Sequence, residues 1–114
     1  GHVHAHGLST VKCDAEEAQA INAVFADRKS PVPVVAGKSY FGNLGSGSGM
    51  VELIASIMSF ENGVLPPTLN YERPDPECPV NVIHDEPASD LPPVFIKLSQ
   101  SSTGQAASAI FAAP

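Results

Sequence analysis

The stretch that decides the fold runs from residue 2 to residue 17 and reads His2-Val-His-Ala-His-Gly-Leu-Ser-Thr-Val-Lys-Cys-Asp-Ala-Glu-Glu17. Residues 2–6 predict a short strand that ends at Gly7. Asp14, with Glu17 three residues later, has the pattern of a capping box, so a helix is expected to open at Asp14. One face of this helix is apolar and carries Ala18, Ile21, Val24 and Phe25.

A second strand and a second helix follow. Residues 32–36 are a compact apolar run that predicts a buried strand, and the Gly/Ser-rich residues 37–49 predict a loop. Residues 50–61 predict a helix whose polar residues share one stripe, and whose other residues are mainly apolar. Such a helix is expected to be mostly buried, so Glu52 on that stripe should be paired rather than solvated. The helix is expected to end at Asn62-Gly63.

The rest of the chain predicts strands. Residues 64–79 are rich in proline and predict an irregular loop, and strands are expected at 80–83, 94–98 and 107–112. The last two could form an antiparallel pair. The expected order is β-α-β-α-β-β-β, and the fold class is α/β with a mixed sheet, because parallel strands need helical crossovers. Residues 1–114 fit one domain.

Composition excludes several function classes. The net charge is −6 with only six Lys plus Arg, so neither a nucleic-acid surface nor an anionic membrane surface is expected. No apolar run is long enough for a transmembrane helix, and the first residues do not resemble a signal peptide. Two widely spaced cysteines are typical of reduced thiols, so a cytoplasmic location is expected.

Three weaker patterns concern metal, nucleotide and thiol chemistry. His2, His4 and His6 alternate along the first strand, so a metal-binding module is one hypothesis beside that of a partly buried strand. Nucleotide motifs fail on spacing at Gly37-Lys-Ser and at Gly45–Gly49, and no cofactor is expected. Cys13 lies where a helix N-terminus lowers a thiol pKa, but neighbouring carboxylates would oppose that change.

Four stretches together resemble the C-terminal half of a β-ketoacyl-acyl-carrier-protein synthase. The first is His4-Ala-His-Gly-Leu-Ser-Thr10, similar to Asn-Ala-His-Gly-Thr-Ser-Thr in that family, and the second is Gly37-Lys-Ser-Tyr-Phe-Gly-Asn43, where the family carries Thr-Lys-Ser-x-x-Gly-His. Gly49-Met-Val-Glu52 resembles the family's helix entry. Gly63-Val-Leu-Pro-Pro-Thr-Leu-Asn70 and Asp75-Pro-Glu-Cys78 resemble its proline-rich loop.

The resemblance implies half of a thiolase-like fold, truncated on its N-terminal side and belonging to a longer chain. It implies an acyltransferase of fatty-acid or polyketide assembly, which joins acyl and malonyl thioesters by decarboxylative condensation. His6 would match the first catalytic histidine, Lys38 the lysine and Glu52 the glutamate, while Thr10 would lie near the carrier's phosphopantetheine. An acyl carrier protein and the missing half or a synthase partner are the implied partners, and a homodimer is compatible with the family.

Departures from the family keep the function open. Asn43 replaces the second histidine, although an Asn amide can still donate a hydrogen bond to a thioester oxygen. Leu98-Ser-Gln-Ser-Ser-Thr-Gly104 replaces an Asn-Ser-Phe-Gly-Phe-Gly-Gly loop, and Cys13 and Cys78 match no nucleophile position. The isolated chain is therefore expected to be inactive, and a non-catalytic ketosynthase-like partner subunit is the alternative to an enzyme.

Overall fold

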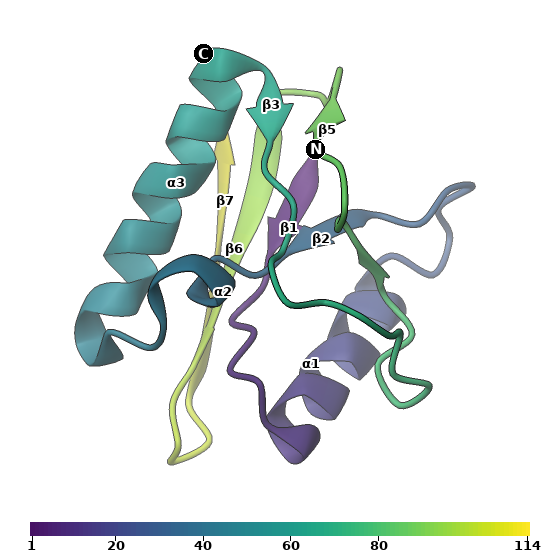
Figure 1. Ribbon diagram of the computed structural model, residues 1–114, viewed down its shortest axis with the longest axis vertical. Helices are drawn as coiled ribbons and strands as arrows, with labels where there is room; N and C mark the ends of the chain where they lie inside the picture. The colour runs from purple at the N-terminus through teal and green to yellow at the C-terminus, as the bar shows by residue number, and fades with distance from the viewer.

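The computed structural model describes all 114 residues, and a five-stranded mixed sheet forms its centre (Figure 1). The elements follow one another as β1 (His2–His4), α1 (Val11–Val24), β2 (Pro33–Val35), α2 (Lys38–Phe41), the 3-10 turn η1 (Gly45–Gly47), α3 (Ser48–Asn62), β3 (Val64–Leu65), β4 (Asn81–Val82), β5 (Ala88–Ser89), β6 (Val94–Gln100) and β7 (Ala106–Ala112). The strand order in the sheet is β4-β2-β1-β6-β7.

The sheet combines parallel and antiparallel pairing. β1 lies at its centre and pairs in parallel with β2 and β6, and β2 pairs in parallel with β4. β7 closes one edge and runs antiparallel to β6. The prediction of an α/β fold with a mixed sheet is confirmed, and so is the antiparallel pair at the end of the chain.

The two long helices cover opposite faces of the sheet, with α1 on one side and α3 on the other (Figure 1). On the α1 side, Val3 and Ala5 of the first strand segment pack with Ile21 in the hydrophobic core. On the α3 side, His2 and His4 point toward Ser56. Every residue of β1 is buried because both of its faces are covered.

The start of α1 differs from the prediction. The helix begins at Val11 with Thr10 at the cap position, and it ends at Val24. Asp14 is not the cap, because it lies inside the helix and its Oδ1 accepts the backbone N–H of Ser9 at 3.2 Å. Ser9 has a positive φ of 66°, so the chain turns sharply there and the helix starts earlier.

The segment predicted as a loop over 37–49 is more ordered than expected. It holds α2, the 3-10 turn and the first residues of α3. Gly63 has a φ of 65° and ends α3 in the left-handed conformation, as predicted. The proline-rich region contributes β3, which pairs antiparallel with β5 in a small second sheet that was not predicted.

The orientation of α3 contradicts the prediction that its apolar residues are buried. Its buried residues are Ser48, Glu52 and Ser56, which form one polar stripe facing the sheet. The large apolar side chains lie on the outer face and are exposed, among them Met50, Val51, Ile54, Ile57 and Met58. The stripe faces inward because its polar side chains have partners on the sheet: Lys97 of β6 pairs with Glu52, and His4 of β1 contacts Ser56. None of the helices is both long and apolar enough to cross a membrane.

Candidate active site

A buried ion pair joins Lys38 and Glu52. Lys38 opens α2 directly after β2, and Glu52 lies on the inner stripe of α3. The Lys38 Nζ lies 2.6 Å from Glu52 Oε1, and Glu52 is completely buried. The prediction that Glu52 is buried and paired is confirmed, and α2 and α3 are thereby tied together across the sheet edge.

His6 lies just beyond the end of β1, next to the same lysine. Lys38 Nζ donates to the backbone carbonyl of His6 at 2.6 Å and lies 3.4 Å from its Nδ1. An ammonium group can only donate, so Nδ1 is the accepting nitrogen and the ring proton is on Nε2. Burial and then the charge of Lys38 lower the pKa of His6, so this imidazole is neutral near pH 7.

Glu17 of α1 holds the backbone around His6. Its Oε1 accepts the N–H of His6 at 2.6 Å and its Oε2 accepts the N–H of Gly7 at 2.9 Å. Gly7 has a φ of 51°, and a Cβ there would meet the Cβ of Ala36 at 2.6 Å, so only glycine fits. Glu17 therefore fixes the turn that presents His6, which is a different role from the capping box predicted for it.

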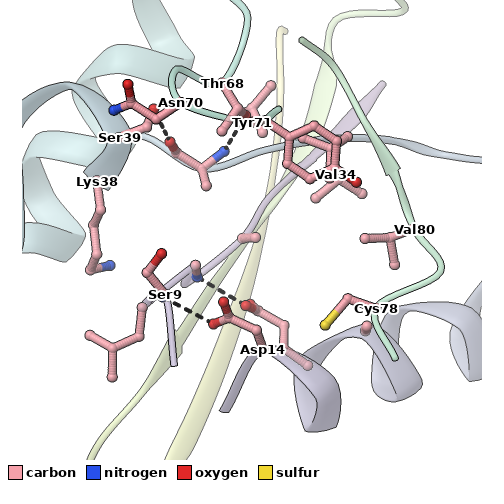
Figure 2. A pocket seen from close by; sticks show the side chains of 18 of the residues that line it. Ser9, Asp14, Val34, Lys38, Ser39, Thr68, Asn70, Tyr71, Cys78 and Val80 are labelled. Carbon is pink, nitrogen blue, oxygen red and sulfur yellow. Dashed lines mark hydrogen bonds between the residues drawn. The ribbon is translucent and has the colours of Figure 1, made fainter. Parts of the chain in front are cut away.

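Asn43 lies after α2 and is exposed. Its Oδ1 accepts the N–H of Gly45 at 3.0 Å and the hydroxyl of Ser48 at 3.3 Å. The amide NH2 group is left as a free donor. Lys38 borders a pocket of about 480 Å³ between α1, β2 and the proline-rich loop (Figure 2). Asn43 also lines this pocket.

Thr10 and His6 face a second hollow, of about 470 Å³, beside the turn of the β6–β7 hairpin. Thr10 is exposed and its side chain makes no capping hydrogen bond. The structure thus gathers Lys38, Glu52 and His6 into one cluster. It places Asn43 and Thr10 on two different hollows on either side of that cluster.

Lys97 is the residue that sequence reasoning missed. It lies on β6, it is buried, and its Nζ lies 2.6 Å from Glu52 Oε2. Burial lowers the pKa of Lys97, and the carboxylate of Glu52 opposes that effect. A single lysine inside the apolar run 94–98 is the signal that could have found it, because a buried charge needs a partner.

His2 and His4 form a separate hydrogen-bonded network beneath α3. Gly37 N–H donates to His4 Nε2 at 3.2 Å, so the ring proton of His4 is on Nδ1 and points to Ser56 Oγ at 2.6 Å. Ser56 Oγ is also 3.3 Å from His2 Nε2. Burial, as the largest cause, lowers the pKa of His4 to about 3 and that of His2 to about 4.

The three histidines do not converge on a common point, although they alternate along one segment. His2 and His4 share Ser56, whereas His6 contacts Lys38. No group of three or more His, Cys, Asp or Glu side chains is arranged to hold a metal ion. The geometry therefore gives the metal-module hypothesis no support.

The thiol of Cys13 donates to Gln100 Oε1 at 2.8 Å. Burial raises the pKa of Cys13, and the carboxylates of Glu17 and Asp14 raise it further. Burial and Asp75 raise the pKa of Cys78 in the same direction. Neither thiol has the electropositive surroundings of an activated nucleophile.

Comparison with known proteins decides the family. The sequence profile described as "Beta-ketoacyl synthase, C-terminal domain" matches residues 1–72, which is more than half of the chain. The chain belongs to the β-ketoacyl synthase C-terminal domain family. The β-ketoacyl synthase resemblance seen in the sequence motifs is therefore confirmed, and the matched residues contain His6, Lys38 and Glu52.

Curated relatives cover the same region of much longer proteins. The ketoacyl synthase alpha subunit of the tetracenomycin polyketide synthase from Streptomyces glaucescens is 32% identical over 99% of this β-ketoacyl synthase domain and 26% of its own length. The 3-oxoacyl-[acyl-carrier-protein] synthase 2 of Synechocystis sp. is 37% identical over 72% of the domain and 20% of its own length. The chain thus spans about a quarter of these relatives or less.

Solved ketosynthase structures share the fold. One is a type II polyketide synthase acyl-carrier protein in complex with its ketosynthase, with a TM-score of 0.92 and 28% identity over 99% of this chain and 28% of that one. The ishigamide ketosynthase/chain length factor has a TM-score of 0.89 and 30% identity over 97% of this chain and 27% of that one. The domain has a thiolase-like ketosynthase fold, and the proteins that it resembles are ketosynthases of fatty-acid and polyketide synthesis.

Proposed function

We propose that this domain supplies the malonyl-binding half of a decarboxylative condensing site in a longer ketosynthase. The observation that carries the proposal is the position of Lys38, whose Nζ binds both Glu52 and the backbone and ring of His6. This arrangement leaves the Nε2–H of a neutral imidazole free to donate. A fixed donor aimed at a developing negative charge is the usual form of oxyanion stabilisation.

The chemistry follows from these donors. A malonyl thioester loses its carboxylate as CO2, and the electron pair of the broken bond forms an enolate whose charge lies on the thioester oxygen. His6 Nε2–H would donate to that oxygen, and we propose that Asn43, which borders the other hollow, turns its NH2 toward the bound thioester as a second donor. The enolate carbon then attacks an acyl thioester, a C–C bond forms, and the thiolate of the acylated cysteine leaves.

The acylated cysteine belongs to another part of the protein. The raised pKa values of Cys13 and Cys78 argue against either thiol as the nucleophile. The length of the relatives supports the same conclusion, because they are about four times as long as this chain. We propose that residues 1–114 form one domain of a longer chain, and that Thr10 contacts the phosphopantetheine of an acyl carrier protein.

The test uses the longer protein, assayed for decarboxylation of malonyl-carrier-protein and for the condensed product by mass spectrometry. His6→Ala is expected to lower both rates by roughly 100- to 1000-fold, the loss typical of an oxyanion donor. His84→Ala is the matched control, because His84 is half-exposed, pairs with Asp85 and lines neither hollow. Equal rates for the two variants would contradict the proposal, as would C–C bond formation by the isolated 114-residue chain.

A non-catalytic partner subunit is the second candidate function. The local bonds of Asn43 favour it, because its Oδ1 is committed to Gly45 and Ser48 and its side chain does not contact His6. The altered 98–104 hairpin points the same way. In that case the longer protein lacks a cysteine at the nucleophile position, and it restores the product of an active synthase while having no activity alone.

A further inference from the structure

Lys97 lies outside residues 1–72, the part of the chain that the family profile matches. On β6, Phe95 and Lys97 are two residues apart and share the face of the sheet that α3 covers. The sheet register places them beside His2 and His4 of β1. Lys97 is only 6% exposed. A lysine is almost never buried to this degree without a partner, so its surroundings are informative.

The partner of Lys97 is the carboxylate already bound by Lys38. Lys97 Nζ lies 2.6 Å from Glu52 Oε2, while Lys38 Nζ lies 2.6 Å from Glu52 Oε1. Each carboxylate oxygen therefore has its own lysine. Lys97 Nζ also donates to the backbone carbonyl of Leu98 and lies 3.4 Å from Ser99 Oγ. These contacts anchor the ammonium group to its own strand.

Two lysines on opposite oxygens fix the plane of the carboxylate. The terminal torsion of a glutamate side chain has only a weak preference, so either carboxylate oxygen could pair with a single cation. With Lys97 on Oε2, only Oε1 faces Lys38, and the remaining donors of Lys38 are directed at His6. A continuous chain of contacts thus runs from Lys97 through Glu52 and Lys38 to the His6 ring.

We propose that Lys97 is a positioning residue that acts through Glu52 and Lys38 to keep the ring proton of His6 on Nε2. The inference deepens the proposed function and rests on it, since Nε2–H is the donor that His6 would offer to the thioester. Lys97 touches neither His6 nor either of the two hollows. Its influence on the tautomer is therefore transmitted by the carboxylate, while its charge also acts on the pKa of His6 through space.

The charges around His6 support the same chain of effects. Burial is the largest cause of its lowered pKa, and Lys38 and Lys97 lower it further. Glu17 of α1 and Glu52 of α3 act in the opposite direction. Loss of the Lys97 charge removes one lowering effect and releases part of the Glu52 charge, so both consequences raise the pKa of His6.

The first test is a nitrogen-15 NMR titration of the His6 ring in the 114-residue chain and in its Lys97→Met variant. Met keeps the length and apolar stem of lysine and removes its charge. We expect the wild-type ring to have one protonated nitrogen, Nε2, and the variant to show a tautomer mixture and a pKa raised by about half a unit or more. Lys29→Met removes the same charge from an exposed position outside both hollows and should leave His6 unchanged.

The second test separates transmission through Glu52 from a direct effect of charge. In a Glu52→Gln background, studied at a pH where Lys97 still carries its proton, Lys97→Met should change the His6 tautomer no further. Equal effects in both backgrounds would overturn the proposal, because Lys97 would then act on His6 without the carboxylate. An unchanged tautomer in a folded Lys97→Met variant would overturn it as well.

A third measurement needs no variant and covers the case in which Lys97→Met fails to fold. The pKa of Lys97 is lowered from its usual 10.5, so raising the pH should neutralise it while the wild-type chain is folded. The His6 nitrogen shifts should then change with the same midpoint as the Lys97 side-chain resonances. A flat response of His6 through that midpoint would refute the inference. These readouts do not depend on turnover, so an inactive longer protein would count against the proposed function alone.

Discussion

Glu52 is the residue whose replacement tests the buried site most directly. Glu52→Gln keeps the size of the side chain and removes its charge, which leaves Lys38 and Lys97 facing a neutral amide in a completely buried position. Gln retains one carbonyl oxygen, so it can serve one ammonium group but not both. We expect Lys97 to be the lysine that loses its proton, because its pKa is already lowered by burial.

The size of the effect follows from the cost of that proton. Neutralising a lysine with the usual pKa of 10.5 at pH 7 costs on the order of 5 kcal/mol, at about 1.36 kcal/mol per pH unit. Removing one partner of a buried ion pair typically costs about 3 to 5 kcal/mol, which agrees. A domain of this size has a stability of roughly 5–15 kcal/mol, so a large part of it should be lost.

Urea denaturation followed by circular dichroism measures the loss. With a slope of about 2 kcal/mol per molar urea, a loss of about 4 kcal/mol moves the midpoint down by about 2 M. The unfolded chain binds the Lys97 proton and the folded variant does not, so stability should rise toward pH 10.5 by about 1.4 kcal/mol per unit.

Glu16→Gln is the matched control for this prediction. Glu16 pairs with Lys12 at 3.8 Å on the exposed face of α1, and such pairs contribute about 0.5 kcal/mol or less. The reasoning fails if Glu52→Gln loses less than about 1 kcal/mol with an unchanged urea slope. It also fails if the stability of the variant does not rise with pH.

Three further outcomes are expected. Gly37→Ala should lower the free energy of unfolding by about 1–3 kcal/mol in urea denaturation, because the new Cβ would lie 2.7 Å from His4 Nε2. The new Cβ of Gly47→Ala meets no atom within 4 Å, so this variant should lose less stability, and equal losses would contradict the packing argument. Stability should fall as the pH drops from 6.5 to 5, by up to about 1.4 kcal/mol per pH unit for each of His2 and His4. The cause is that these histidines bind protons in the unfolded chain at a pH where they are still neutral in the folded chain. Urea midpoints that do not change with pH would contradict this. At pH 7, iodoacetamide should react with the thiol of Cys13 more slowly than it reacts with the thiol of glutathione, because the pKa of Cys13 is raised. Peptide mass spectrometry follows the reaction, and an equal or faster rate at Cys13 would contradict the prediction.

Much of the site could be predicted because it is carried by short-range patterns. The polar stripe of α3 predicted a paired Glu52, and the resemblance at Gly37-Lys-Ser put Lys38 in the same site as Glu52 and His6, with which it is in contact. Lys97 was missed because its contact with Glu52 depends on how β6 and α3 meet in space, which no local periodicity encodes. The strands were predicted close to their observed positions for the opposite reason, since apolar runs between turns are local signals.

Two errors have physical causes of their own. The capping-box pattern at Asp14 was misleading because the carboxylate of Glu17 binds the backbone of His6 and Gly7 and does not close a cap. The helix α3 was predicted to be mostly buried, but its large apolar side chains are exposed, because a mainly apolar sequence does not say which face meets the sheet. Burial of Glu52 with its two lysines decided the orientation against the usual rule.

For protein engineering, the outward-facing side of α3 and its inner stripe can be treated as separate design regions. Met50, Ile54 and Met58 are exposed and follow one another at four-residue spacing along the outer face, so charged residues placed there would leave the contacts of Glu52 intact. Such resurfacing lowers the exposed apolar area, which favours solubility at the concentrations that spectroscopy requires. The helix thus offers a way to make the buried lysine pair observable in solution without altering it.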